Sequence, residues 1–190
     1  KYFKLPSRIE QQPVPSRATK LIECPRDAMQ GIDRFIETDT KAAYINQLLR
    51  VGFDSIDFGS FVSPKAIPQM RDTAEVLAKL DLSGTTTKLL AIVANERGAL
   101  DACRHPEIQY LGYPFSISET FQLRNTNATI AESVERTQSI QELCEKYGKQ
   151  LVLYISMGFG NPYGDPWNVE IVQRWVDVLA PYGIRIFSLS

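Results

Sequence analysis

The segment at residues 21–30 reads Leu-Ile-Glu-Cys-Pro-Arg-Asp-Ala-Met-Gln, an apolar run followed by a proline and then by an Arg-Asp pair. The run predicts a short buried strand that Pro25 ends, because proline has no N–H to donate to a strand ladder. Arg26 and Asp27 would then stand at the carboxyl end of that strand, where parallel α/β sheets carry their active sites. Arginine keeps its proton and can stabilise an oxyanion, and aspartate is a hard oxygen ligand for Mg²⁺ or Mn²⁺. The structural alternative is a helix-capping aspartate that pairs with its neighbouring arginine.

Apolar segments typical of strands recur along the rest of the chain and alternate with segments of helical periodicity. Strands are predicted at residues 21–24, 53–58, 88–94, 108–115, 151–155 and 185–189. Helices are predicted at residues 38–52, 73–80, 97–104 and 129–148, and from residue 165 onward. Such alternation argues for a parallel sheet with right-handed crossovers.

A doubly wound sheet and a TIM (β/α)8 barrel both fit that pattern. The barrel is favoured because no Gly-rich dinucleotide loop follows the first strand. Polar side chains also recur at the carboxyl ends of the strands, and a barrel gathers these ends around one mouth. They are Arg26, Asp27, Asp57, Asn95, Ser116, Ser156 and Ser188. A complete barrel usually needs about 250 residues, so the chain is expected to hold about six of the eight strands, within a single catalytic domain at residues 18–190. Residues 1–17 are expected to form an irregular arm.

Helix ends are marked by local signals. Thr38 or Asp39 can cap the first predicted helix, and Thr129 with Glu132 matches a capping box. Asp165-Pro166 has the order of a cap followed by a first-turn proline, and predicts the start of the last helix. Two apolar stripes at helical spacing are expected to be buried: Ile130, Val134, Ile140, Leu143 and Tyr147, then Val169, Val172, Val176 and Leu179.

Three stretches resemble a known family. Residues 26–30, Arg-Asp-Ala-Met-Gln, resemble the Arg-Asp-Gly-x-Gln signature of metal-dependent lyases and synthases that act on 2-oxo acids and acyl-CoA. Residues 60–70 look like the segment after the second strand of 3-hydroxy-3-methylglutaryl-CoA (HMG-CoA) lyase, almost residue for residue. Residues 160–164, Gly-Asn-Pro-Tyr-Gly, are similar to the loop after its fifth strand. The likeness runs in unbroken order over residues 20–190, and the sequence is identified as a member of the HMG-CoA lyase family.

The resemblance implies cleavage of HMG-CoA to acetyl-CoA and acetoacetate with the help of Mg²⁺ or Mn²⁺. Asp27 would be one metal ligand, and Arg26 would bind the thioester carbonyl and stabilise the enolate. Gln30 would hold the site through hydrogen bonds, and Asp57 stands where the family usually has Glu, in a slot suited to orienting its neighbours. Substrate contacts are also expected from Ser60 and Ser188.

The sequence departs from the family pattern at two points. Ala28 replaces the glycine of the signature, which carboxyltransferase members of the superfamily tolerate as well. The family also takes two His from a seventh strand and an Asn from a later loop as metal ligands, and its catalytic Cys lies beyond the same strand. None of these is present in the 190 residues. The one histidine, His105, is expected at the opposite face of the barrel, in a structural role.

Composition limits the partners. The formal net charge of −1 gives no reason to expect nucleic acid, and no apolar run is long enough to span a membrane. Residues 1–17 lack the apolar core of a signal peptide. The three cysteines are far apart in the sequence, which suggests a reducing, cytoplasmic setting. Cys24 is interpreted as a small core residue, and Trp167 and Trp175 are expected to share one helix. The family suggests a homodimer with an acyl-CoA substrate.

Two alternatives stay open at this point. One is a Claisen-type synthase of the same superfamily, which joins acetyl-CoA to a 2-oxo acid; the stretch at residues 60–70 argues against it. The other is a non-catalytic, open-barrel interaction module, which the missing His ligands suggest. That module would expose apolar strand edges and tend to associate.

Overall fold

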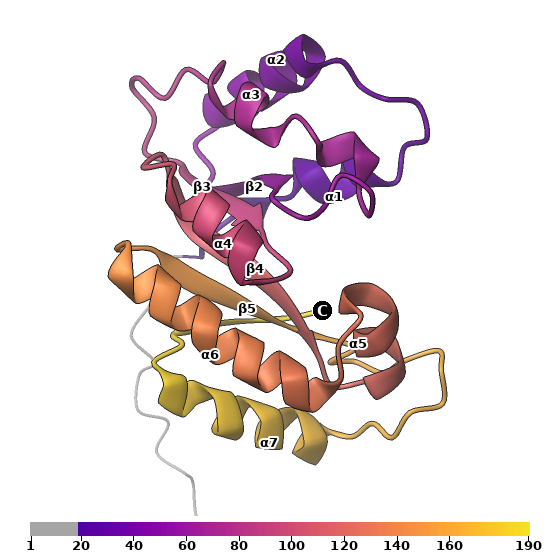
Figure 1. Cartoon of the computed structure of the whole chain (residues 1–190). Helices are drawn as coiled ribbons and strands as arrows, with labels where there is room; N and C mark the ends of the chain where they lie inside the picture. The colour runs from indigo at the N-terminus through magenta and orange to yellow at the C-terminus, as the bar shows by residue number, and fades with distance from the viewer. Residues whose placement is uncertain (1–18) are drawn as a thin grey trace, which may run out of the picture.

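The computed structural model describes residues 19–190 and shows a curved sheet of six parallel strands with helices packed on its outer side (Figure 1). The strands lie side by side in sequence order. Their bounds are β1 Ile22–Glu23, β2 Ser55–Ser60, β3 Lys88–Ile92, β4 Ile108–Ser116, β5 Gln150–Ser156 and β6 Ile186–Leu189. The helices are α1 Pro25–Gln30, α2 Thr38–Leu49, α3 Thr73–Leu77, α4 Glu96–Cys103, α5 Glu119–Thr126, α6 Ile130–Lys146 and α7 Val169–Leu179, with 3-10 turns η1 Pro68–Met70 and η2 Ala180–Tyr182. The predicted N-terminal arm, residues 1–17, lies outside the described residues.

The predicted fold is confirmed, because these elements form six strands of a TIM barrel. Within residues 19–190, β1 and β6 each pair with a neighbour on one side only, so the barrel is open. The prediction that the first strand is buried is wrong, since the side chains of Leu21 and Ile22 are 64% and 57% exposed. An edge strand has no neighbour to cover it. Pro25 also does more than end this strand, because it is the first residue of α1.

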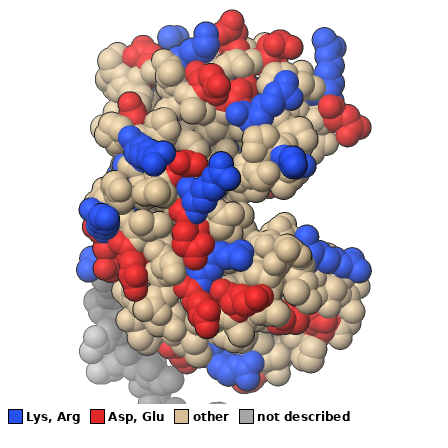
Figure 2. All heavy atoms as spheres, viewed as in Figure 1, with Lys and Arg blue, Asp and Glu red and all other residues tan. Residues whose placement is uncertain are grey.

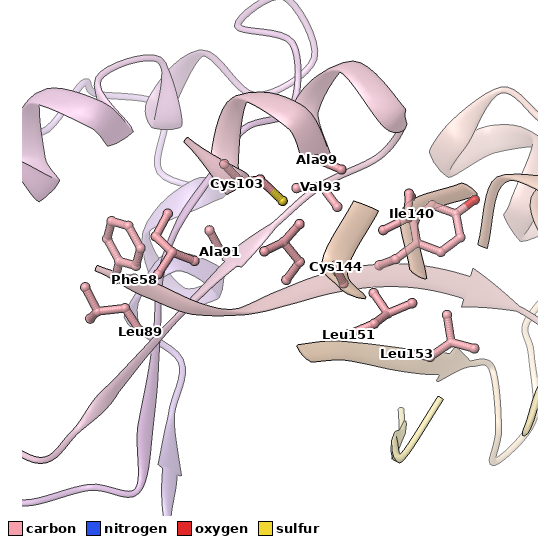
Figure 3. Close-up of a cluster of buried hydrophobic side chains, with 14 of the residues drawn as sticks. Phe58, Leu89, Ala91, Val93, Ala99, Cys103, Ile140, Cys144, Leu151 and Leu153 are labelled. Atoms are coloured by element: carbon pink, nitrogen blue, oxygen red, sulfur yellow. The ribbon is translucent and has the colours of Figure 1, made fainter. Parts of the chain in front are cut away.

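The main hydrophobic core lies between the sheet and its outer helices (Figure 3). Side chains of β2 to β5 meet the apolar faces of α2, α4 and α6 there. Ile140 is fully buried on α6, in agreement with the predicted stripe, and Thr129 forms the predicted capping box with Glu132. Tyr147 does not join the stripe, because it follows the last turn of α6 and is exposed. Because this core packs the strands against the outer helices, it fixes the positions of the carboxyl ends of β2 to β5.

Two predicted helix caps are wrong. α2 begins at Thr38 after Glu37, and neither Thr38 nor Asp39 caps it. The Thr38 hydroxyl instead donates a hydrogen bond of 2.7 Å to Asp72. α7 begins at Val169 after Asn168, whose side chain accepts from the N–H of Ile171. At α2, the Thr38 hydroxyl is bonded to Asp72 and does not cap the helix. At α7, the expected cap Asp165 lies three residues before the actual cap, Asn168.

Asp165 does not start α7 because its carboxylate is bound to α5. It accepts hydrogen bonds from the hydroxyl of Ser118, at 2.5 Å, and from the N–H and hydroxyl of Thr120, both at 3.0 Å. Trp167 consequently lies before α7 rather than on it, and its indole N–H donates to the carbonyl of Gly158. Val169 is exposed at the first turn, whereas the rest of the predicted stripe packs against the core.

The remaining predictions divide between buried and exposed positions. Cys103 and Cys144 are buried at the helix–sheet interface, whereas Cys24 is exposed, so the interpretation of Cys24 as a core residue is wrong. His105 lies between α4 and the start of β4, and the centroid of its ring lies 5.4 Å from that of Phe61, which follows β2. Among residues 19–190, no helix combines the length and the apolar character needed to cross a bilayer.

Candidate active site

The first turn of α1 and the middle of β2 hold a buried ion pair. Arg26 Nε donates to both carboxylate oxygens of Asp57 at 3.1 Å, and Nη2 donates to Oδ2 at 2.6 Å. The Asp57 side chain is 1% exposed and that of Arg26 is 11% exposed. β2 is buried along its whole length, and the sheet register shifts between Asp57 and Gly59, beside the ion pair. The side-on, multiply bonded geometry fixes the plane of the guanidinium.

The other side of the same guanidinium is held by its own helix. Nη1 donates to Gln30 Oε1 at 2.7 Å and to Asp27 Oδ1 at 3.2 Å. Gln30 Nε2 also lies 3.4 Å from the same Asp27 oxygen. Arg26 and Gln30 are four residues apart, so they share one face of α1. An arginine has five N–H groups. Among residues 19–190, these three partners engage four of the five, so one N–H on Nη2 has no partner there and can bind a ligand.

Burial shapes the protonation of this pair. Burial raises the pKa of the Asp57 carboxyl above its ordinary value, and the hydrogen bonds and positive charge of Arg26 oppose that shift. Burial also disfavours the charge of Arg26, but the hydrogen bonds and negative charge of Asp57 outweigh this effect, so the pKa of Arg26 is raised. Arg26 therefore stays a cation, and Asp57 is its counter-ion.

Tyr154 belongs to the same neighbourhood, although the sequence analysis did not single it out. It lies on β5, beside Ser188 of β6 in the sheet register, and packs with the inner apolar cluster of the barrel. Burial and the negative charge of Asp57 raise the pKa of its hydroxyl well above the ordinary value. Tyr154 is thus a neutral hydrogen-bond donor at physiological pH. The alternation of β5, in which Leu153 and Ile155 face the outer core, could have identified it as an inward residue.

The structure brings four of the predicted site residues together: Arg26, Asp27, Gln30 and Asp57. Ser188 lies on the strand next to Tyr154 and is partly exposed. Ser60 is buried at the end of β2, where its hydroxyl donates to the carbonyl of Ile92 and accepts from the N–H of Val62. These contacts tie β2 to β3 and to the loop that follows.

The described residues do not form a complete metal site. Asp27 is 67% exposed and offers carboxylate oxygens at the mouth. Within residues 19–190, however, no three His, Cys, Asp or Glu side chains gather around a possible ion. Cys24 lies close to the pair, but partial burial of its thiol and the negative charge of Asp57 raise the pKa of that thiol, so it is not an activated nucleophile.

The site opens into a hollow. The space-filling view shows the molecule notched on the side toward which the strands' carboxyl ends point, between the α1 and α5 ends of the sheet (Figures 1 and 2). Acidic and basic side chains alternate on the visible surface, without a large patch of one sign. A small ligand in this notch would have α1, the helix that carries Arg26, Asp27 and Gln30, on one side (Figure 1).

Comparison with known proteins gives a consistent answer. No family model matches the chain. The hydroxymethylglutaryl-CoA lyase of Bacillus subtilis is 33% identical over 94% of this chain and 59% of its own length. The 3-hydroxy-3-isohexenylglutaryl-CoA/hydroxymethylglutaryl-CoA lyase of Pseudomonas aeruginosa is 32% identical over 90% of this chain and 57% of its own length. Both relatives align along nearly the whole of the chain.

Solved structures agree with the sequence relatives. An HMG-CoA lyase from Acinetobacter baumannii, solved with coenzyme A and 3-methylmalate, superposes with a TM-score of 0.83 and 32% identity over 90% of this chain and 55% of its own. The Bacillus subtilis HMG-CoA lyase gives a TM-score of 0.83 and 33% identity, over 90% of this chain and 57% of its own. The chain spans more than half, but less than two thirds, of the length of these relatives. Over the six βα units that it contains, the chain is similar to HMG-CoA lyases in both sequence and fold.

Proposed function

We propose that the whole protein is a carbon–carbon lyase that cleaves HMG-CoA to acetyl-CoA and acetoacetate. The observation that carries the proposal is the Arg26 guanidinium, which three side chains hold in one orientation with one N–H left for a ligand. The similarity of the chain to HMG-CoA lyases supports the choice of substrate.

The reaction needs a group that stabilises negative charge on the thioester oxygen. When the C–C bond breaks, its electrons form an enolate on the acetyl-CoA part, and the oxygen of that enolate requires a fixed positive donor. Arg26 can donate its remaining N–H to this oxygen while Asp57 and Gln30 keep the guanidinium in place. Because these partners are already bound, little reorganisation is needed when charge develops.

A divalent cation, Mg²⁺ or Mn²⁺, is proposed from the family resemblance alone. When bound, such an ion supplies Lewis-acid stabilisation of the substrate alkoxide. Asp27 is the candidate ligand in this chain, since its carboxylate is exposed at the mouth beside Arg26. The described residues do not complete the coordination, so no step is assigned to the ion.

The substrate class is an acyl-CoA, and the solved relative from Acinetobacter baumannii, with coenzyme A bound, supports this part of the proposal. A homodimeric state and a cytoplasmic location stay predictions. The alternative of a Claisen-type synthase has less support, because the relatives reported above are lyases by name.

A two-substrate assay tests the proposal. The whole protein is offered HMG-CoA in one mixture, and acetyl-CoA with 2-oxoisovalerate in another, each with Mg²⁺; acetoacetate and free thiol are followed separately. The lyase proposal predicts acetoacetate in the first mixture and no thiol release in the second. Thiol release only in the second mixture would assign the protein to the synthases. No turnover in either would favour the non-catalytic module.

A further inference from the structure

The loop that follows α1, residues 31–37, contains no helix or strand, yet one buried side chain holds it at three positions. That side chain is Gln69 of η1. Its Nε2 donates to the carbonyls of Ile32 and Arg34, at 2.9 and 3.0 Å. Its Oε1 accepts from the N–H of Ile36 at 2.9 Å. Both hydrogens and the oxygen of the amide are thus engaged by the loop.

Gln69 is itself anchored by a buried ion pair. The Lys41 ammonium of α2 donates to the backbone carbonyl of Gln69 and to Oδ1 of Asp72, the latter at 2.6 Å. The other oxygen of Asp72 accepts from the Thr38 hydroxyl. Both charged side chains are buried, and a buried charge is costly to leave without its partner. The backbone of Gln69 therefore has a rigid support.

The side chain of Phe35 fixes the same loop a second time. The guanidinium carbon of Arg71 lies 3.6 Å from the centroid of the Phe35 ring, and the Lys41 ammonium lies 4.2 Å from it. Cations at these distances are attracted to an aromatic ring. The loop is thus held both by its backbone, at Gln69, and by its aromatic side chain.

Ile32 connects this held loop to the Arg26 site. The N–H of Ile32 donates to the carbonyl of Met29 in the last turn of α1, at 3.0 Å, whereas the carbonyl of Ile32 accepts from Gln69. α1 and η1 are also in contact. Gln30 belongs to the same last turn, and its Oε1 accepts the 2.7 Å hydrogen bond from Arg26. A displacement of the loop would therefore move the group that orients the guanidinium.

We propose that Gln69 is a positioning residue: it fixes the last turn of α1 and so, through Gln30, the direction of the Arg26 guanidinium. Within residues 19–190, the side-chain hydrogen bonds of Gln69 go to the loop and not to the Arg26 site, so its action is indirect. The consequence for catalysis rests on the proposed function. The consequence for the guanidinium does not.

Solvent exchange of the Arg26 guanidinium N–H groups, followed by ¹⁵N NMR in the whole protein, tests the positioning without turnover. Arg26→Met identifies these signals by their loss. Gln69→Met keeps a side chain of similar length but cannot bond the loop. The exchange should become about tenfold faster, the scale for losing a hydrogen bond.

A second variant and a control make this test specific. Gln69→Glu still accepts from the N–H of Ile36 but cannot donate to the carbonyl of Ile32, and it should speed the exchange as well. Thr38→Val is the matched control, because it removes one hydrogen bond of the same buried network and none from the loop. Its exchange should equal that of the original protein, and thermal melting checks that each variant is folded. Unchanged exchange in both Gln69 variants would overturn the inference, as would equal acceleration in Thr38→Val.

Kinetics then connect the positioning to the proposed reaction. Gln69→Met should lower the kcat for HMG-CoA cleavage roughly tenfold to a hundredfold, the scale for a small misplacement of a catalytic group, with little change in KM. In the Arg26→Met background it should cause no further loss, because both changes act through one guanidinium. An equal loss in both backgrounds would give Gln69 a merely structural role and overturn the inference. Absence of turnover in the original protein would instead contradict the proposed function, and the exchange result would still decide whether Gln69 positions Arg26.

Discussion

The two faces of the sheet differ in what they contribute. On the outer face, β2 to β5 bury a continuous apolar cluster against the helices. On the inner face, the buried apolar cluster within residues 19–190 consists of Leu90, Ile92, Tyr110 and Val152, and the polar pair of Arg26 and Asp57 lies beside the open mouth. The difference indicates that the outer interface supplies most of the stability, whereas the inner face is free to carry chemistry. Substitutions on the two faces should therefore have different consequences.

The largest effect on stability is expected at Asp57. This residue belongs to the polar pair near the inner face, but its carboxylate is buried, so its loss should destabilise the fold. Asp57→Leu leaves the Arg26 guanidinium buried without its partner and should lower the free energy of unfolding by about 3–5 kcal/mol. Urea unfolding measures this loss. The double variant Arg26→Met/Asp57→Leu removes both charges and should recover much of the stability. A double variant as unstable as the single one would show that the ion pair is not the cause.

A matched pair of leucines tests the comparison itself. Leu111 faces the outer core on β4, and Leu90 faces the inner cluster on neighbouring β3; both are buried. Leu111→Ala should cost about 2–5 kcal/mol, because the surrounding helices cannot close the cavity. Leu90→Ala should cost less, since its cluster borders the open mouth. Equal losses in urea unfolding would contradict the division between the faces.

Asp165 tests a polar contact at the mouth, with a smaller effect. The hydrogen bond from the Ser118 hydroxyl, followed by the bond from the Thr120 N–H, lowers the pKa of Asp165 below its ordinary value of 3.8. A lowered pKa means that the carboxylate stabilises the folded state above pH 3.8, and that this stabilisation is lost as the pH falls through the folded-state pKa. Asp165→Asn should therefore be less stable than the original at neutral pH. The two melting temperatures should converge in acid; a constant difference across pH would refute the ionic contribution.

The smallest effect is expected at β6, which is an edge strand within residues 19–190. Leu189 lies on β6 and is 48% exposed. Leu189→Ser should change the free energy of unfolding by no more than about 0.5 kcal/mol. Its effect should instead appear as reduced self-association in sedimentation velocity. An exposed apolar strand edge can pair with another chain, and serine removes the apolar surface that Leu189 contributes to that edge. A large loss of stability in this variant would mean that the edge is packed.

The sequence predicted the order of strands well because each strand carries its own apolar pattern. The prediction of burial failed where the exposure of a strand depends on which elements pack beside it in the fold. Leu21 and Ile22 look buried, yet they are exposed because β1 is an edge. α1 and α5 were not predicted as helices. Pro25 was interpreted as the end of a strand although it begins α1, and the residue that α5 buries is the polar Gln122, so no apolar stripe marks that helix.

The candidate site shows the same limit. The motif at residues 26–30 identified Arg26, Asp27 and Gln30, whose contacts are local in sequence. The contact between Arg26 and Asp57 joins residues 31 positions apart and depends on how α1 packs on β2. Tyr154 was missed because its place beside the pair follows from the register of β5, which no local motif reveals.

The central claim is that Arg26 stabilises the enolate with the N–H that Asp57 and Gln30 leave free. The most direct test is the kcat for acetoacetate formation from HMG-CoA by the whole protein carrying Arg26→Met, with the fold checked by circular dichroism. The account predicts a fall of about 10²–10³-fold, the scale for losing a fixed oxyanion donor. An unchanged kcat in the folded variant would contradict it and remove Arg26 from the mechanism.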